Sequence, residues 1–487
     1  MGSDWAKVKV ADIASTKKGA IAIGPFGSRM KSDCYVAEGI PVIRGLNISS
    51  TKLFVGDFVY ISSKKAITLG NANVYPGDIV FPHRGAIGQV AIVPNDDIGH
   101  YVLSSSLMKL TVNTDLVIPE FVVYFFRSSA GNHEILQYAS TVGTPGIGQP
   151  LTSLRSMELL LPPLPEQKVI AHVLGSLDDR IELNRRMNET LEAMAQALFK
   201  SWFVDFDPVL DNAINAGKKI PDELTERADM RRTILDQNQN AECGIINAEL
   251  KKHSSLKIHN SSFNSLFPDE FTHSDELGLI PKGWEVQPLY NIANFINGAA
   301  FKNAHFSTEP NALPIVKIVE IKNGVSEQTK STTDSFEDKY RIDDGEILFS
   351  WSGNPDTSID TFIWTGGPGW LNQHIFRVSL KSSQDHNFVY YLLKALRAVF
   401  AEIARDKQTT GLGHVTVKDM KNLYVLKPKD SMIDAFNRFS CPLFNKWYAN
   451  LHGTRQLEVL RDTLLPKLLS GEIRIPDAEK IVEELAL

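Results

Sequence analysis

Apolar residues recur along residues 166–200 at alternating spacings of four and three, which is typical of a helix that packs against another helix in a coiled coil. The segment contains no proline, and Asn184 and Asn188 interrupt the apolar series. Asparagine at such a seam fixes the register and orientation of a helix pair at some cost in stability. The pattern therefore predicts a long helix with a partner helix.

A second and poorer copy of this seam lies 266 positions later, with Asn450 at the position of Asn184. Pro442 and Gly453 lie within it and weaken the predicted helix. We expect Pro442 in a first turn, with a shorter helix running on to about Leu465.

Each seam follows a segment that is itself duplicated. Gly77–Phe81 matches Gly345–Phe349, and Leu103–Lys109 matches Leu371–Arg377, both at an offset of 268 positions. Chance similarity would not stay in order over about 140 residues, so the chain contains two copies of one mixed α and β domain. Further matches lie at offsets between 265 and 279: Pro41–Arg44 with Pro314–Lys317, Phe121–Tyr124 with Phe388–Tyr391, Gly146–Gln149 with Gly411–His414, and Trp5 with Trp284.

The expected fold class is α+β, with two duplicated α/β domains separated by two long antiparallel coiled-coil helices. Each copy precedes its helix, so antiparallel pairing keeps the copies apart and relates them by a pseudo-two-fold axis. The first helix would be about 50 Å long. DNA sites one helical turn apart are separated by roughly 34 Å, so a helix pair of this length is suited to setting the distance between two DNA sites. The boundaries are 1–165 and 276–429 for the copies, 166–206 and 430–470 for the helices, 207–275 for a polar connector with a helical piece near 221–235, and 471–487 for a tail.

The charge is distributed unevenly along the chain. The net charge of -6 would by itself argue against a nucleic-acid partner. Residues 1–165 carry +2 and residues 276–429 are neutral, whereas residues 166–275 carry -6. The charge therefore leaves DNA binding open, and it predicts that the chain alone binds DNA weakly. The three widely spaced cysteines and the lack of a long apolar run favour a cytoplasmic location.

Motifs that would carry catalysis are missing from the sequence. It contains no phosphate-binding loop, dinucleotide fingerprint, zinc-protease motif or nucleophile elbow. Asn354-Pro355-Asp356 is similar to the Asn-Pro-Pro-aromatic motif of amino-methyltransferases, but it lacks the second proline and the aromatic residue, and we interpret it as a turn. We therefore expect a non-catalytic scaffold that holds neither a metal nor a cofactor.

Four segments together resemble the specificity (S) subunit of a Type I restriction–modification enzyme: Leu161–Gln167, Leu198–Phe206, Leu277–Trp284 and Leu465–Glu472. The resemblance implies two target-recognition domains, each reading one half of a split, asymmetric site in double-stranded DNA. It also implies that the two helices set the spacing and dock two methyltransferase (M) subunits, and that restriction/translocase (R) subunits complete the enzyme. S-adenosylmethionine, ATP and Mg are then expected on the partner subunits.

Base reading needs side chains with paired donors and acceptors, and phosphate binding needs cations, hydroxyls and amides. Such residues recur in matched loops of both copies with different identities, as in Gln149 against His414 and Arg84 against Ser352. Divergence of unused loops would give the same pattern. In the first domain the candidates are Lys17, Lys18, Arg29, Lys31, Arg44, His83, Arg84, Ser105, Thr144 and Gln149; in the second they are Lys302, Lys317, Trp351, Ser352, Asn354, Gln373, Lys407, Gln408, Thr410 and His414.

The aromatic residues Phe199, Trp202 and Phe203 lie beyond the first seam. Either they pack the helix end, or they belong to the surface that docks methyltransferase subunits, which the resemblance favours. With Asn184, Asn188 and Asn450 they complete the spacer and docking candidates. Two other functions remain open from the residues: a coiled-coil scaffold or adaptor without sequence-specific DNA binding, and a free-standing DNA-modifying enzyme with an unrecognised site.

Overall fold

The computed structural model describes residues 5–26, 29–48, 52–54, 56–140, 145–243, 265–408, 411–473 and 480. The chain divides into two compact units. Unit 1 comprises Met1–Arg185 with Gly453–Leu487, and unit 2 comprises Arg186–His452. Each unit therefore holds one copy of the duplicated domain together with one part of each long helix.

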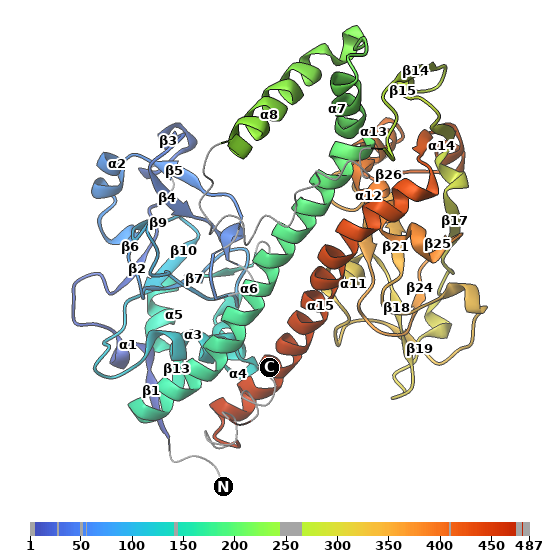
Figure 1. Cartoon of the computed structure of the whole chain (residues 1–487). Helices are drawn as coiled ribbons and strands as arrows, with labels where there is room; N and C mark the ends of the chain where they lie inside the picture. The colour runs from blue at the N-terminus through green and yellow to red at the C-terminus, as the bar shows by residue number, and fades with distance from the viewer. Residues whose placement is uncertain are drawn as a thin grey trace. The chain divides into compact units, whose positions relative to one another are not determined.

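The first copy combines a sheet of strand order β2-β10-β7-β8 with a mixed sheet of order β3-β5-β4-β9-β6, and β1 pairs with β13 (Figure 1). Its apolar core lies between the first sheet, α3 and the start of α6. The strands are β1 (Ala6–Lys9), β2 (Ile21–Ile23), β3 (Tyr35–Val36), β4 (Ile40–Ile43), β5 (Val59–Ile61), β6 (Asn73–Val74), β7 (Ile79–Pro82), β8 (Ala91–Ile92), β9 (Tyr101–Leu103), β10 (Leu107–Leu110), β11 (Ala139–Ser140), β12 (Gly146–Ile147) and β13 (Glu158–Leu161). The helices are α1 (Val10–Ile13), α2 (Ser63–Thr68), α3 (Pro119–Arg127), α4 (Ser129–Leu136) and α5 (Pro150–Ser156).

The second copy repeats this plan, with sheets of order β17-β25-β21-β23 and β19-β18-β24-β20, and β16 pairs with β27. Its strands are β16 (Glu285–Pro288), β17 (Ala293–Asn297), β18 (Leu313–Val316), β19 (Ser331–Thr332), β20 (Arg341–Ile342), β21 (Ile347–Ser350), β22 (Ser352–Gly353), β23 (Asp360–Ile363), β24 (Gly369–Leu371), β25 (Ile375–Leu380), β26 (Gly413–His414) and β27 (Tyr424–Lys427). The helices are α11 (Ile318–Asn323), α12 (His386–Ala395), α13 (Arg397–Asp406) and α14 (Val417–Asn422).

The strand registers of the two copies correspond residue by residue. Phe81 of β7 stands opposite Met108 of β10, and Phe349 of β21 stands opposite Phe376 of β25. Both partners differ by the offset of 268 that the sequence shows. The duplication and the α+β fold class are confirmed.

The long helices are α6 (Leu164–Phe203) and α15 (Asp430–Leu469) (Figure 1). The prediction of a shorter second helix was wrong, because α15 passes through Pro442 and Gly453 without a break. Pro442 is exposed, so the carbonyl that loses its N–H partner is close to water. Gly453 faces α6, where a Cβ atom would lie 3.7 Å from Nδ2 of Asn184.

The two helices run antiparallel in both units. In unit 1, Asp178 and Arg185 of α6 contact Arg461 and Glu458 of α15. In unit 2, Asn188 contacts Asn450, and the ring of Phe199 lies 5.8 Å from that of Phe436. Residue numbers rise along α6 while they fall along α15, which is the predicted pairing.

The connector contains more regular structure than the sequence predicted. α6 ends at Phe203, Phe206 adopts a left-handed φ of 56°, and Pro208 lies in the first turn of the next helix. The predicted helical piece is present and longer, and a strand was missed. These elements are α7 (Asp207–Asn215), α8 (Thr225–Cys243) and β14 (Phe271–Ser274); β14 pairs with β15 (Gly278–Pro281), which lies in the range of the second copy. Within the described part of the chain, every helix is too short or too polar to cross a membrane.

Candidate nucleic-acid interface

The strand order of the first copy brings four loop segments to one edge. β4 runs parallel to β9, so Arg44 and Ser104 follow strand ends that lie together. β7 and β10 run antiparallel, so His83 and Arg84 follow β7 where β10 begins. Backbone hydrogen bonds join these segments: Ser104 N–H donates to the carbonyl of Ile43 at 2.9 Å, and His83 N–H donates to that of Ser106 at 2.9 Å. We call this group the first polar edge: Arg44, His83, Arg84, Ser104–Ser106 and Gly146.

His83 holds the first polar edge together from within. Its ring is 3% exposed, and Nε2–H donates to the carbonyl of Ser105 at 3.0 Å. Burial lowers the pKa of His83, and the nearby Arg84 guanidinium lowers it further, which favours the neutral ring. His83 is one of the predicted DNA-binding residues; its side chain is buried and contacts the backbone of Ser105.

The second copy builds the corresponding edge with different side chains. Lys317 follows β18, Gln373 and His374 follow β24, and Trp351 and Ser352 follow β21. Trp351 Nε1–H donates to Oδ1 of Asn297 at 3.0 Å, and its ring centroid lies 5.7 Å from that of His374. We call this group the second polar edge: Asn297, Lys317, Trp351, Ser352, Asn372–His374 and His414.

One predicted correspondence between the copies was wrong. The sequence aligned Gln149 with His414, because both follow a Gly-x-Gly pattern. In the structure Arg84 stands opposite Gly146, and Ser352 stands opposite His414. Strand pairing thus keeps the offset of 268 here as well, and the glycine pattern is displaced by three positions. Gln149 is exposed and directly precedes α5.

Two predicted residues lie away from the first polar edge. Lys17 and Lys18 precede β2, beside Gly19 and Asn71 at the opposite end of that strand. Four others lie in exposed or partly exposed loops. Lys31 precedes a short 3₁₀ turn, Lys302 follows β17, and Lys407 and Gln408 follow α13.

Some of the candidate side chains are already engaged within the protein. Arg29 donates to the carbonyl of Thr68 at 3.0 Å, and Lys407 forms an ion pair with Asp419. Asn354 accepts the N–H of Asp356 at 2.9 Å, which confirms the predicted turn. Thr144 and Thr410 lie outside the described residues.

The geometry is therefore that of two equivalent polar edges on one duplicated scaffold. A model of the Type I restriction modification DNA specificity domain matches residues 2–193 and 281–431. The chain belongs to this family.

The similarity to individual members of the family also extends over most of the chain. The chain is 27% identical over 415 residues to the Type I restriction enzyme HindI specificity subunit of Haemophilus influenzae, which covers 82% of this chain and 86% of that one. It is 25% identical over 490 residues to the MjaIX specificity subunit of Methanocaldococcus jannaschii, with 97% and 94% covered. A crystal structure of a Type-I restriction-modification S subunit from M. genitalium has the same fold, with a TM-score of 0.52, 15% identity and 96% of each chain covered.

The asparagines of this family member's helix seam form a direct pair in unit 2. Asn450 Nδ2–H donates to Oδ1 of Asn188 at 2.9 Å, and Asn188 Nδ2–H donates to the carbonyl of Trp447 at 3.0 Å. Both asparagines are buried. Shifting either helix along the other would separate these buried amides from their partners, which agrees with the predicted role in register.

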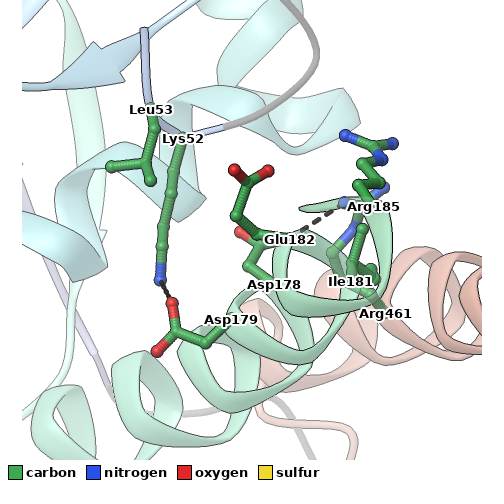
Figure 2. A pocket seen from close by; sticks show the side chains of 8 residues that line it. All are labelled: Lys52, Leu53, Asp178, Asp179, Ile181, Glu182, Arg185 and Arg461. Atoms are coloured by element: carbon green, nitrogen blue, oxygen red, sulfur yellow. Dashed lines mark hydrogen bonds and ion pairs between the residues drawn. The ribbon is translucent and has the colours of Figure 1, made fainter. Parts of the chain in front are cut away.

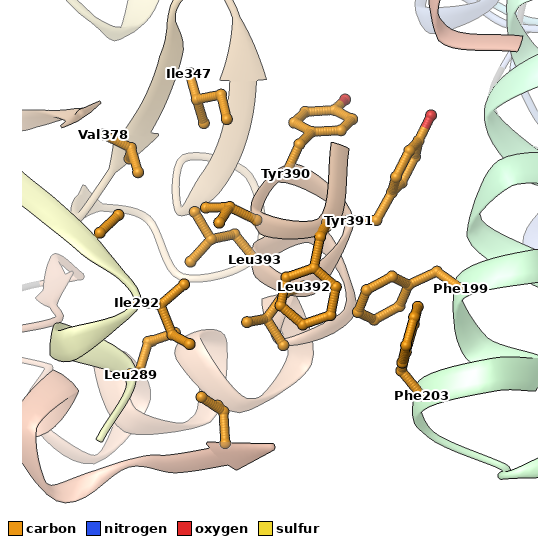
Figure 3. Close-up of a cluster of buried hydrophobic side chains, with 14 of the residues drawn as sticks. Phe199, Phe203, Leu289, Ile292, Ile347, Val378, Tyr390, Tyr391, Leu392 and Leu393 are labelled. Atoms are coloured by element: carbon orange, nitrogen blue, oxygen red, sulfur yellow. The ribbon is translucent and has the colours of Figure 1, made fainter. Parts of the chain in front are cut away.

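Of the two interpretations of Phe199, Trp202 and Phe203, the structure supports packing of the helix end and not the docking surface that the resemblance favours. All three side chains are buried in the core of unit 2. Figure 3 shows Phe199 and Phe203 of α6 facing Tyr391 and Leu392 of α12. Their rings also lie 5.7 Å and 5.2 Å from that of Phe388. Burial of aromatic area against the second copy explains the cluster.

Unit 1 contains a buried polar network that the sequence pattern did not predict. The Asp178 carboxylate accepts from Arg461 Nη1 at 2.9 Å and from the Tyr124 hydroxyl at 2.9 Å, and Arg127 Nη1 lies 3.6 Å away. Burial raises the pKa of Tyr124 above its ordinary value. Next to this network, Lys52 donates to Asp179 at 2.7 Å and lines a small pocket (Figure 2). In the sequence, the one indication of this network is Arg461, a charged residue at a position of the second seam where an apolar residue is expected.

A second missed feature recurs in both copies at the offset of 268. Lys109 Nζ lies 3.3 Å from the Asp78 carboxylate, and Arg377 Nη2 lies 2.6 Å from that of Glu346. Both pairs lie at the ends of the central strands away from the polar edges, so their role is structural. Among the described residues, no group of three or more His, Cys, Asp or Glu side chains is placed to hold a metal ion.

Proposed function

We propose that this chain is the DNA sequence-recognition subunit of a Type I restriction–modification complex. Each polar edge reads one half of a bipartite, asymmetric site in double-stranded DNA. The chain presents the DNA to partner subunits and carries out no chemistry itself.

One observation carries this proposal. The backbone of the two polar edges has the same strand register, whereas the side chains at corresponding positions differ. At the offset of 268, His83 corresponds to Trp351, Arg84 to Ser352 and Ser105 to Gln373. The strands that position these residues keep the same register in both copies. Base edges in the major groove differ in their pattern of donors and acceptors. Edges that differ only in their side chains are suited to reading two different half-sites.

The spacer in this proposal is the antiparallel pair of α6 and α15. Its register is fixed in unit 2 by the pair Asn188–Asn450 and in unit 1 by Asp178 and Arg461. We propose that the length of these helices sets the gap between the half-sites.

The proposed partners are two methyltransferase subunits and the restriction/translocase subunits. Methyl transfer to adenine would use S-adenosylmethionine on the methyltransferases, and cleavage would use ATP and Mg on the restriction subunits. The support is similarity to proteins that are specificity subunits by name. Because the aromatic cluster of α6 is buried, we propose that docking uses other surfaces.

An exchange of domains tests the proposal. The chain is expressed with its methyltransferase, residues 1–165 are replaced by the first copy of another family member, and methylated adenines are mapped. We expect a change in one half of the recognised sequence only. Replacing residues 276–429 is the matched control and should change the other half. A change in both halves, or in neither, would contradict separate reading, and methylation without sequence preference would favour a scaffold.

A further inference from the structure

The arginines of the first copy differ in whether their guanidinium groups are already engaged. Within the described residues, Arg84 and Arg155 are exposed and form no hydrogen bond or ion pair through their side chains. Of these two unengaged arginines, Arg84 belongs to the first polar edge and Arg155 does not. The others have partners: Arg29 donates to the carbonyl of Thr68, Arg44 to that of Asp57, and Arg127 lies beside Asp178.

The backbone around Arg84 is held on two sides. On one side, His83 N–H donates to the carbonyl of Ser106 at 2.9 Å. On the other, Arg84 bridges to Gly146, and Ile147 N–H donates to the carbonyl of His83 at 2.9 Å. A side chain on a fixed backbone loses less freedom on binding than one on a mobile loop. Arg84 is thus a free planar donor on a rigid support.

Guanine presents two acceptors, N7 and O6, in the major groove, and the arginine fork matches both. We propose that Arg84 reads a guanine in the half-site contacted by the first polar edge. This inference rests on the proposed function, and it adds the identity of one base and the residue that reads it.

The second polar edge lacks this donor. Ser352 occupies the position of Arg84, and its backbone pairs with His414 as that of Arg84 pairs with Gly146. A serine hydroxyl both donates and accepts, so it selects weakly among bases. Guanine reading at this position therefore belongs to the first copy alone, which makes the two half-sites chemically different.

A phosphate contact is the alternative use of a free guanidinium. It would strengthen binding to every sequence about equally and would carry no base preference. Loss of a bidentate guanine contact instead relaxes one position, by about 5- to 150-fold in discrimination. Loss of a phosphate contact would therefore lower methylation at all sites, whereas loss of the guanine contact would change the base preference at one position of the methylated sequence.

The experiment uses the full chain with its methyltransferase. Genome-wide adenine methylation is mapped by long-read sequencing for the wild type, Arg84→Ala, Arg84→Lys and the control Arg155→Ala, which removes an exposed arginine from α5 of the same copy. We expect Arg84→Ala to relax one G·C pair in one half-site. We expect Arg84→Lys to relax the same pair less, and Arg155→Ala to keep the wild-type map.

A second measurement, made on the wild type, tests the proposal even if Arg84→Ala does not fold. Methyl transfer by the wild type is measured on duplexes that carry 7-deazaguanine, which lacks N7, at each guanine of the site in turn. We expect one substitution to slow the wild type and to leave a folded Arg84→Ala unaffected. Relaxation at an A·T pair, a uniform loss at all sites, or a wild type insensitive to every substitution would overturn the proposal. A wild-type map without a bipartite motif would overturn the proposed function itself.

Discussion

Arg461 of α15 donates to Asp178 of α6 across 2.9 Å, and both side chains are largely buried. The contact also binds the first copy, because Tyr124 and Arg127 of α3 lie against the same carboxylate. One acidic group thus neutralises two guanidinium groups that have few other partners. Three helices of unit 1 therefore meet at this one carboxylate.

Removal of this carboxylate should therefore be costly. We expect Asp178→Ala to lower the free energy of unfolding by about 3–5 kcal/mol, because the buried Arg127 loses its counter-charge and the buried Arg461 keeps only the exposed Asp462. Urea denaturation of the full chain measures this. Asp462→Ala removes an exposed neighbour of Arg461 and should cost about 0.5 kcal/mol or less. Equal effects of the two variants would show that the buried network carries no special weight.

The pair Asn188–Asn450 allows a double-mutant cycle. Replacing Asn188 by leucine leaves the Asn450 amide without this partner, and replacing Asn450 leaves Oδ1 of Asn188 without its donor, each at about 1–3 kcal/mol in a buried seam. Replacing both removes the stranded group, so the double variant should be more stable than the sum of the single losses predicts. Urea denaturation of the four proteins gives the coupling free energy. Additive losses would mean that the two side chains do not act as a pair.

His83 predicts a pH dependence of stability. Burial lowers its pKa below the ordinary value of 6.5, so the unfolded chain binds a proton there that the folded chain resists. This residue therefore contributes stability above pH 6.5 that is lost as the pH falls further. Between pH 7.5 and 5.5 the wild type should lose more unfolding free energy than His83→Gln, measured by urea denaturation at each pH. The exposed His133→Gln is the control, and parallel profiles for wild type and His83→Gln would rule out this contribution.

Length of the spacer should control the gap in the recognised sequence. Inserting one heptad into both α6 and α15 at matched seam positions adds about 10 Å of helix, close to three base-pair steps of roughly 3.4 Å. We expect the mapped methylation site to keep both half-sites and to widen its gap by about three base pairs. Matched insertion keeps the seam in register, whereas insertion in α6 alone is expected to disrupt it. An unchanged gap with intact half-sites would refute the spacer role.

The sequence predicted what depends on repetition along the chain. The offset of 268 reappears in the strand pairs Phe81–Met108 and Phe349–Phe376, since a duplicated domain keeps its hydrogen-bond register. The seam of α6 was predictable for the same reason, because its apolar residues repeat at short, regular spacings within one segment. The sequence alignment of the two copies was wrong at His414, where it followed a Gly-x-Gly pattern at an offset of 265 although strand pairing keeps 268.

Features that depend on tertiary contacts were not predictable in this way. Pro442 is tolerated because its face of α15 is exposed, and Phe199 is buried because the second copy packs on it. Neither environment is encoded in neighbouring residues. The Asp178 network joins segments more than 280 positions apart, and no local pattern relates them.

The central claim is that two equivalent polar edges read two separate half-sites. The most direct test maps adenine methylation by long-read sequencing in cells that make this chain and its methyltransferase, against cells that make the methyltransferase alone. The account predicts methylation at one bipartite, asymmetric sequence with a fixed gap, only when the chain is present. Methylation at a continuous sequence, at a symmetric one, or independent of the chain would contradict it.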